Sequence, residues 1–175
     1  MKPSKNQLGA DNQQEKQIGW IVGFVDGEGT FSVSINRNPT TNSGWQIFPE
    51  FVITQGEKSL PALKEIQQFF DCGKLYVNRR RDNHKENLYR YCVRSLKNLE
   101  DKIIPFFTVH KLRTAKKEDF VKFVRILALI KRGQHLRPKG LRRIAEIIQT
   151  MNRKKPSRYL LSPETIRQES REVCD

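Results

Sequence analysis

The chain has 175 residues, of which 33 are lysine or arginine and 19 are aspartate or glutamate, so its formal net charge is +14. This length excludes a multidomain machine, and the 37% hydrophobic content is typical of a globular protein. Because so large a positive excess favours a polyanionic partner, nucleic acid is the expected ligand, with an anionic membrane surface as the alternative.

The N-terminal segment 1–16 is rich in lysine, asparagine and glutamine, and we expect it to be a disordered arm. An apolar run from Ile18 to Val25 follows and ends in the acidic, glycine-rich corner Asp26-Gly27-Glu28-Gly29. No apolar run is long enough to span a bilayer, and the N-terminus lacks the hydrophobic stretch of a secretory signal. We therefore expect a soluble intracellular protein without a membrane partner, in bacterial cytoplasm, mitochondrion or chloroplast.

Four strands are predicted after the corner. Alternating apolar residues indicate strands at 30–36 and 45–54, joined as a hairpin by the turn-rich loop 38–44. A helix over 59–70 precedes a third strand at 74–78 and a fourth at 88–94. The phasing gives the sheet one apolar face and one polar, basic face, as expected for an antiparallel sheet that is solvated on one side.

The rest of the chain is predicted to be helical. Helices are expected at 96–107, 115–131 and 141–151, and they would cover the apolar face of the sheet. The domain is expected to span 17–152, followed over 153–175 by a basic linker and a short C-terminal helix that starts near Ser162. Cys72, Cys92 and Cys174 form no CxxC pair and lie far from the histidines in sequence, which disfavours a zinc finger or a disulfide framework.

The acidic corner permits two interpretations. A carboxylate at the C-terminal end of a helix is disfavoured, because the last carbonyls already carry about half a negative charge. A hard divalent cation held by Glu28 and a neighbouring backbone carbonyl would offset that cost. Alternatively, Asp26-Gly27-Glu28-Gly29 is simply a turn.

The corner also carries a resemblance to a known family. The string Ile21-Val22-Gly23-Phe24-Val25-Asp26-Gly27-Glu28-Gly29 resembles the signature of the LAGLIDADG homing endonucleases. Further segments follow in the order of that family: Ile53-Thr54-Gln55, Gly73-Lys74-Leu75, 101–106 and 112–120. The resemblance covers about 18–151.

The resemblance implies an α+β fold of the order αββαββα, whose four-stranded antiparallel saddle is backed by helices and lies over DNA in the major groove. The polar face predicted from the strand phasing mixes guanidinium, amide and hydroxyl groups that can read base edges or contact phosphate. Its residues are Ser32, Ser34, Asn36, Gln46, Phe48, Glu50, Lys74, Tyr76, Asn78, Arg80, Arg90 and Arg94. The alternative is a solvated face with no partner.

Only one copy of the signature is present, and in this family a single-motif chain works as a homodimer. Gly19, Gly23 and Gly27 recur every four residues and would form a stripe along which two helices can approach closely. Each glycine costs about 1 kcal/mol relative to alanine in a helix, so three of them need a packing reason. The alternative is packing against the protein's own core.

By resemblance, Glu28 is the metal-binding acid of the signature, beside the main chain of Gly27, and Asp26 is a structural residue at the end of the helix. Gln55 matches a position that places water or metal near the scissile phosphate, or it is an ordinary strand-end amide. Lys116 matches a lysine that can stabilise the charge on the phosphorane. Because Lys111, Arg113 and Lys117 lie in the same stretch, the register of this lysine stays open.

The sequence therefore favours a site-specific homing endonuclease, encoded within a group I intron or a similar element. It would make a double-strand break in a long pseudo-palindromic double-stranded DNA by hydrolysis that depends on Mg²⁺ or Mn²⁺. Two alternatives keep the same fold without cleavage: a maturase that binds intron RNA and a DNA-binding regulator.

Overall fold

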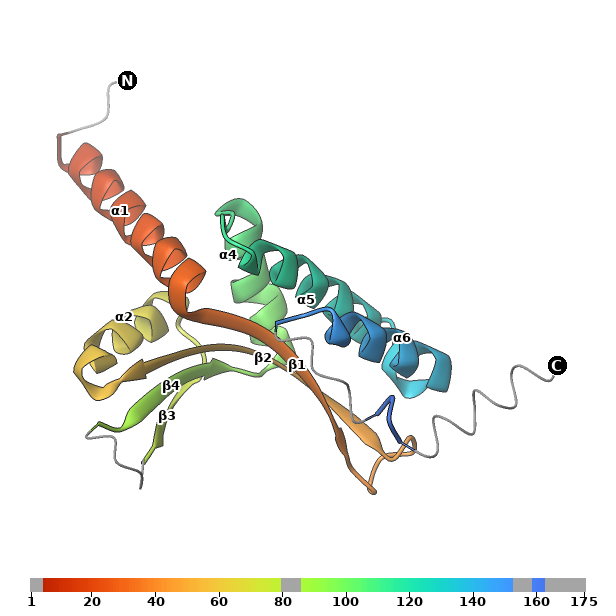
Figure 1. Ribbon diagram of the computed structural model, residues 1–175. Helices are drawn as coiled ribbons and strands as arrows, with labels where there is room; N and C mark the ends of the chain where they lie inside the picture. The colour runs from red at the N-terminus through yellow and green to blue at the C-terminus, as the bar shows by residue number, and fades with distance from the viewer. Residues whose placement is uncertain (1–4, 80–85, 153–158, 163–175) are drawn as a thin grey trace, which may run out of the picture. The chain divides into compact units, whose positions relative to one another are not determined.

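The computed structural model describes residues 5–79, 86–152 and 159–162 (Figure 1). The chain forms two compact units, the first made of Met1–Thr30 and Phe51–Lys117 and the second of Phe31–Glu50 and Glu118–Asp175. Its four strands follow the order β1-β2-β4-β3 in one sheet, and β2 contributes residues to both units. This four-stranded antiparallel sheet with helices confirms the predicted α+β class.

The four predicted strands and the helices predicted over 59–70, 96–107, 115–131 and 141–151 are present, the second of these as consecutive helical segments. The helices are α1 (Lys5–Glu28), α2 (Leu60–Phe70), α3 (Leu96–Asn98), α4 (Ile104–Val109), α5 (Lys116–Lys131) and α6 (Pro138–Gln149). The strands are β1 (Gly29–Arg37), β2 (Trp45–Gly56), β3 (Lys74–Asn78) and β4 (Leu88–Val93). Short helical turns lie at Glu57–Ser59, Leu99–Ile103 and Gln134–Leu136.

Helix α1 begins much earlier than the sequence indicates. It starts at Lys5, so the prediction of a disordered arm over 1–16 is wrong for residues 5–16. The glutamines, lysine and glutamate of this segment are good helix formers, and lengthening an existing helix avoids the cost of nucleation. Apolar periodicity, on which the prediction depended, does not detect such a polar extension.

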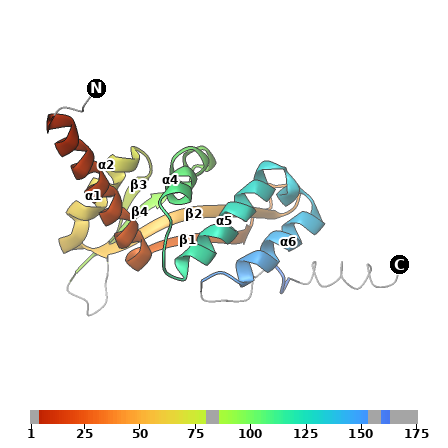
Figure 2. The same cartoon turned by 90° about the horizontal axis from the view of Figure 1, so that it is seen from above.

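The first unit has an aromatic core between its part of the sheet and its helices. Phe51 of β2 contacts Phe70 of α2, Tyr91 of β4 and Phe107 of α4, with ring centroids 5.7–6.3 Å apart. Tyr91 and Phe51 are fully buried. Figure 2 shows α2 beside the β3 and β4 strands, as in Figure 1. The apolar alternation of β2 and β4 is therefore explained by packing against α2 and α4.

The strand register of this unit fixes which residues share a face. Thr54 pairs with Arg90 and Arg90 with Tyr76, which places these three side chains opposite the aromatic core. Val52 and Cys92 share that face by register, yet both are buried, with 5% and 3% of their surfaces exposed. The face thus combines exposed or partly exposed polar side chains with two buried apolar ones, and Lys74, which pairs with Cys92, is exposed.

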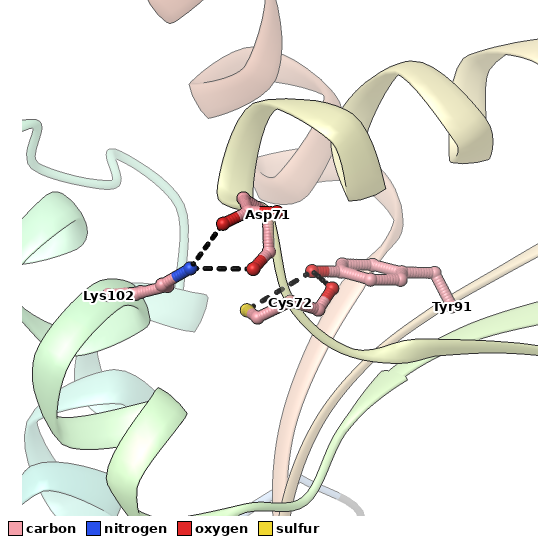
Figure 3. A network of polar contacts seen from close by, with 4 residues as sticks. All are labelled: Asp71, Cys72, Tyr91 and Lys102. Atoms are coloured by element: carbon pink, nitrogen blue, oxygen red, sulfur yellow. Dashed lines mark hydrogen bonds and ion pairs between the residues drawn. The ribbon is translucent and has the colours of Figure 1, made fainter.

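A polar network holds the turn between α2 and β3 (Figure 3). The Lys102 ammonium donates to the backbone carbonyl of Asp71 at 2.6 Å and to its carboxylate at 3.1 Å. The Tyr91 hydroxyl donates to the carbonyl oxygen of Cys72 at 3.0 Å. Burial raises the pKa of the Tyr91 hydroxyl far above its ordinary value and also raises the pKa of the Cys72 thiol. Both groups therefore stay neutral, and the Tyr91 hydroxyl keeps the proton that it donates to the Cys72 carbonyl.

Gly73 is required at this turn, and we expect Gly73→Ala to destabilise the protein strongly. Its φ of +79° is disfavoured for L residues, and an added Cβ would lie 2.6 Å from Cε2 of Tyr91 and 2.8 Å from the carbonyl oxygen of Cys92. Gly44→Ala is a matched control, because Gly44 has a φ of +69° but open space around it. Denaturant unfolding should show a loss of about 3 kcal/mol for Gly73→Ala and about 1 kcal/mol for Gly44→Ala. Equal losses would contradict the steric argument.

The second unit packs α5 and α6 against the β1–β2 hairpin. Phe31 of β1 contacts Phe120 and Phe123 of α5, with ring centroids 5.1 and 5.5 Å apart. In Figures 1 and 2, α6 runs alongside α5. Ile144 and Ala145 of α6 are fully buried. The predicted linker and terminal helix over 153–175 lie outside the described residues, apart from 159–162.

Candidate functional site

The acidic corner forms where α1 passes directly into β1. Helix α1 ends at Glu28, and β1 begins at Gly29. A Cβ at Gly29 would lie 2.6 Å from Cγ1 of Val25 and 2.9 Å from the carbonyl oxygen of Val25. Only glycine allows the strand to leave the helix this closely. The corner therefore holds Asp26, Gly27 and Glu28 at the C-terminal end of a long helix.

Asp26 attaches this helix end to the segment that precedes α5. One of its carboxylate oxygens accepts from the backbone N–H of Arg113 at 2.8 Å. The other accepts from the Thr114 backbone N–H at 3.1 Å and from the Thr114 hydroxyl at 2.8 Å. These bonds support a structural role for Asp26.

The pKa of Asp26 lies below its ordinary value. Partial burial alone would raise this pKa, but the hydrogen bonds from Arg113 and Thr114 and the charge of Lys116 together lower it. A depressed carboxyl pKa stabilises the folded state above the unfolded-state pKa of 3.8, and this contribution is lost as the pH falls through the folded-state value.

We therefore expect Asp26→Asn to lower the free energy of unfolding at pH 7 and to flatten its dependence on pH below about 4. An amide nitrogen cannot accept the bonds that Arg113 and Thr114 donate. Urea unfolding of both proteins between pH 3 and pH 7 measures the effect. If plots of the free energy of unfolding against pH stay parallel for the two proteins down to pH 3, Asp26 titrates alike in the folded and unfolded states, which would contradict the prediction.

Lys116 contacts the corner through its side-chain ammonium, whereas Arg113 does so through its backbone N–H. The Lys116 ammonium donates to the carbonyl oxygen of Asp26 at 2.9 Å and to that of Gly27 at 2.6 Å. Lys111 and Arg113 instead line a groove along α1, and Lys117 is exposed. Among the basic residues between which the sequence could not choose, the geometry therefore favours Lys116.

The other predicted catalytic and metal-binding residues lie in the same unit as Lys116. Glu28 is exposed at the end of α1, adjacent to the Gly27 carbonyl. Gln55 lies near the end of β2, pairs with Tyr89 of β4 and is partly exposed. By strand alternation it shares the face of Ile53 rather than the polar face. The first unit contains Gly27, Glu28, Gln55 and Lys116.

The oxygen atoms at the corner are suitable ligands for a hard cation. A carboxylate and a backbone carbonyl are oxygen ligands of the type that Mg²⁺ and Mn²⁺ prefer, and the Gly27 carbonyl already accepts from a cationic group. In the described part of the chain, no group of three or more His, Cys, Asp or Glu side chains could hold a metal ion. Glu28 and the Gly27 carbonyl are therefore the candidate ligands that the corner itself offers.

The glycine stripe of α1 faces open space. A Cβ built at Gly19, Gly23 or Gly27 has nothing within 4 Å among the described residues. The alternative that the stripe packs against the protein's own core is therefore wrong. Gly19 and Gly23, with Ile18 and Val22, line an open groove of about 630 Å³ together with His110.

The polar face of the first unit displays several predicted DNA-binding residues. Lys74, Tyr76 and Asn78 of β3 are exposed, and Arg90 of β4 is partly exposed. The Arg94 guanidinium carbon lies 5.4 Å from the centroid of the Tyr76 ring, a cation–π distance that orients this arginine on the face. Arg80 lies outside the described residues.

The second unit contributes the hairpin residues. Ser34 and Asn36 are exposed and Ser32 is partly exposed, all on the side of β1 opposite Phe31. Phe48 has 39% of its surface exposed, and Glu50 is partly exposed. Gln46 accepts from the Asn38 side-chain amide at 2.6 Å, so it is fixed by the loop between the strands.

Sequence reasoning missed one residue of this surface. The Arg37 guanidinium carbon lies 5.3 Å from the centroid of the Trp45 ring, at the end of the hairpin. Arg37 directly follows Asn36, the last residue of the predicted strand, and this position next to a predicted DNA-binding residue could have indicated its role. It adds a fixed positive charge to the hairpin.

Comparison with known proteins identifies the family. The family model described as LAGLIDADG endonuclease matches residues 21–127. The chain belongs to this family. The match includes the α1 corner, the four strands and the start of α5, which are the elements that carry the candidate site.

Solved LAGLIDADG structures resemble the chain closely. The homing endonuclease I-TnaI is 37% identical with a TM-score of 0.70, and the match covers 89% of this chain and 97% of that chain. The I-LtrWI LAGLIDADG homing endonuclease, solved bound to target DNA, is 32% identical with a TM-score of 0.72. That match covers 79% of this chain and 45% of I-LtrWI.

Sequence relatives extend the comparison to intron-encoded proteins. Probable intron-encoded endonuclease 2 of Neurospora crassa is 33% identical over 130 residues, which cover 73% of this chain and 26% of that protein. Homing endonuclease I-ApeII of Aeropyrum pernix is 30% identical, over 68% of this chain and 67% of that protein. The chain thus spans about a quarter of the length of the first of these curated relatives.

Proposed function

We propose that the protein is a site-specific homing endonuclease that cuts both strands of a long pseudo-palindromic DNA target by metal-dependent hydrolysis. The observation that carries the proposal is the corner of α1 in a member of the LAGLIDADG family, where the exposed Glu28 directly follows the Gly27 carbonyl that accepts from the Lys116 ammonium. A protein that only binds DNA has no electrostatic reason to place an exposed carboxylate against phosphate.

The polar side chains of the sheet are proposed to contact the DNA. I-LtrWI was solved bound to target DNA, and its likeness covers 79% of this chain. Arg90 and Arg94 can bridge the O6 and N7 atoms of guanine, and Asn36 and Asn78 can pair with adenine. The net charge of +14 supplies the attraction to phosphate that does not depend on sequence.

The active form is proposed to be a homodimer with a twofold axis along the glycine stripe. One copy of this chain matches 45% of I-LtrWI, so two copies correspond to about one such DNA-bound chain. The open space around Gly19, Gly23 and Gly27 allows the helix of a second copy to approach closely. A twofold protein requires a target with two related half-sites.

Glu28 and the Gly27 carbonyl of each protomer are proposed to hold Mg²⁺ or Mn²⁺. The bound ion would activate a water molecule and neutralise charge on the attacking and leaving oxygens. The chain's own groups do the positioning: Gln55 would orient water by hydrogen bonding, and the Lys116 ammonium would stabilise negative charge on the phosphorus-bound oxygens. Water attacks phosphorus, one P–O bond of the backbone breaks, and the leaving oxygen takes up a proton.

The relatives' descriptions favour the endonuclease over the maturase and regulator alternatives. They also favour an origin within an intron, because several matching proteins are described as intron-encoded.

The proposal is tested by incubating the protein with a library of randomised duplexes and Mg²⁺, then sequencing the cut ends. Cleavage at one family of pseudo-palindromic sites is the expected result. Specific binding without cleavage in either Mg²⁺ or Mn²⁺ would favour a DNA-binding regulator. Binding to structured RNA alone would favour the maturase.

A further inference from the structure

The Lys116 ammonium donates a hydrogen bond to the Gly27 carbonyl oxygen, which is the same oxygen that the proposed function assigns to a metal ion. It lies 2.6 Å from the Gly27 carbonyl oxygen and 2.9 Å from that of Asp26. These carbonyls close the C-terminal end of α1, where the helix dipole concentrates negative charge. The ammonium is therefore the counter-cation of the helix end.

The position of Lys116 is fixed from two sides. Its backbone N–H donates to the Thr114 hydroxyl at 3.3 Å, and that hydroxyl donates to the Asp26 carboxylate at 2.8 Å. The start of α5 is thus attached to the end of α1, and the ammonium cannot leave the corner by a movement of the backbone alone. Any displacement must come from rotation of the lysine side chain.

A divalent cation on the Gly27 carbonyl and this ammonium would repel each other strongly. Near a protein surface, the repulsion between two charges of the same sign a few ångströms apart is several times the thermal energy. In addition, a carbonyl oxygen that already accepts a hydrogen bond from an ammonium is a weaker metal ligand. Binding of the metal therefore requires Lys116 to leave the Gly27 carbonyl.

We propose that Lys116 is a built-in competitor of the metal, which holds the Gly27 carbonyl until DNA is bound. This inference rests on the proposed function. Phosphate offers the displaced ammonium a new partner of opposite charge, so DNA binding favours release of the carbonyl and raises metal affinity. Lys116 then serves one role before DNA binds and another, at the phosphate, afterwards.

The test measures Mn²⁺ binding to the protein without DNA, from the EPR signal of the free ion. Lys116→Met should bind Mn²⁺ about tenfold more tightly than the wild type, because the competing charge is removed while the length of the side chain is kept. Lys117→Met is the matched control, because it removes the same charge from the next residue along the chain, whose side chain is exposed. Lys116→Arg keeps the charge and should stay closer to the wild type.

Unchanged or weaker Mn²⁺ binding by Lys116→Met would overturn the proposal, as would an equal gain in Lys117→Met. A second measurement needs no variant: ¹⁵N NMR of the lysine ammonium groups in the wild type. The Lys116 signal should shift when diamagnetic Mg²⁺ is added without DNA, and a Lys116 signal that is unaffected at saturating Mg²⁺ would also overturn it.

Failure of this inference is distinguishable from failure of the proposed function. If Glu28→Gln leaves Mn²⁺ binding unchanged, the metal site itself is wrong. If wild-type protein cuts DNA while Lys116→Met shows no gain in Mn²⁺ affinity, the endonuclease stands and only the competition by Lys116 is rejected.

Discussion

Replacing Glu28 by glutamine is expected to abolish DNA cleavage while leaving the fold and DNA binding intact. The carboxamide has nearly the shape of the carboxylate but no charge to offer a divalent cation. Glu28 is exposed, so the change disturbs no core contact. In a homodimer both copies lose their acid, and we expect cleavage to fall by on the order of 10³-fold or more.

The measurement is single-turnover cleavage of the selected target in Mg²⁺, beside the affinity for the same DNA. Glu118→Gln is the control, because it removes an exposed carboxylate from the first turn of α5 without touching the corner. It should cut at nearly the wild-type rate. DNA binding by Glu28→Gln should stay within a few-fold of the wild type at fixed salt concentration.

Wild-type cleavage by Glu28→Gln would exclude Glu28 as the metal ligand. Asp26 would then be the remaining acid of the corner, but its two carboxylate oxygens already accept from Arg113 and Thr114. Using it as a ligand would require those bonds to break or be shared. The structure therefore favours Glu28 over Asp26 more strongly than spacing in the sequence does.

The alternation of small polar and apolar residues was sufficient to predict the sheet. In β1, Phe31, Val33 and Ile35 are buried as predicted, because side chains on a strand alternate with a strict period of two. The same rule did not predict that Val52 and Cys92 would be buried on the polar face. Burial there depends on tertiary packing, which a strand pattern does not contain.

The candidate site was less predictable than the fold. Resemblance indicated Glu28 and Lys116, but the choice among the basic residues at 111–117 depends on a contact about 90 residues away in sequence. The bonds from Arg113 and Thr114 to Asp26 are of the same long-range kind. Helix propensity in segment 5–16 was visible, but single-residue propensities are weak and were outweighed by the lack of apolar residues.

A leucine at Gly23 is expected to stabilise the folded protomer and to break the homodimer. Nothing lies within 4 Å of a Cβ at this position in the described chain, so the side chain enters open space. Leucine is favoured over glycine in a helix by roughly 0.5–1 kcal/mol, and the free energy of unfolding of the protomer should rise accordingly. The same side chain would hold two α1 helices apart along the stripe.

Sedimentation velocity at several protein concentrations, with and without DNA, measures the dimer directly. Gly23→Leu should sediment as a monomer at concentrations where the wild type is dimeric, and it should lose cleavage because the two corners are separated. Gln14→Leu is the matched control: it adds the same side chain to an exposed position on the opposite side of α1. This control should stay dimeric and active.

The combination of a more stable protomer with a weaker dimer distinguishes an interface from a general folding defect. A variant that merely misfolds would lose helicity and unfold at lower denaturant concentration, whereas Gly23→Leu should do the reverse. On DNA it should still protect a half-site from nuclease digestion, with lower affinity, because the sheet of one copy is unchanged. A Gly23→Leu protein that stayed dimeric and cut DNA at the wild-type rate would overturn the glycine stripe as the dimer interface.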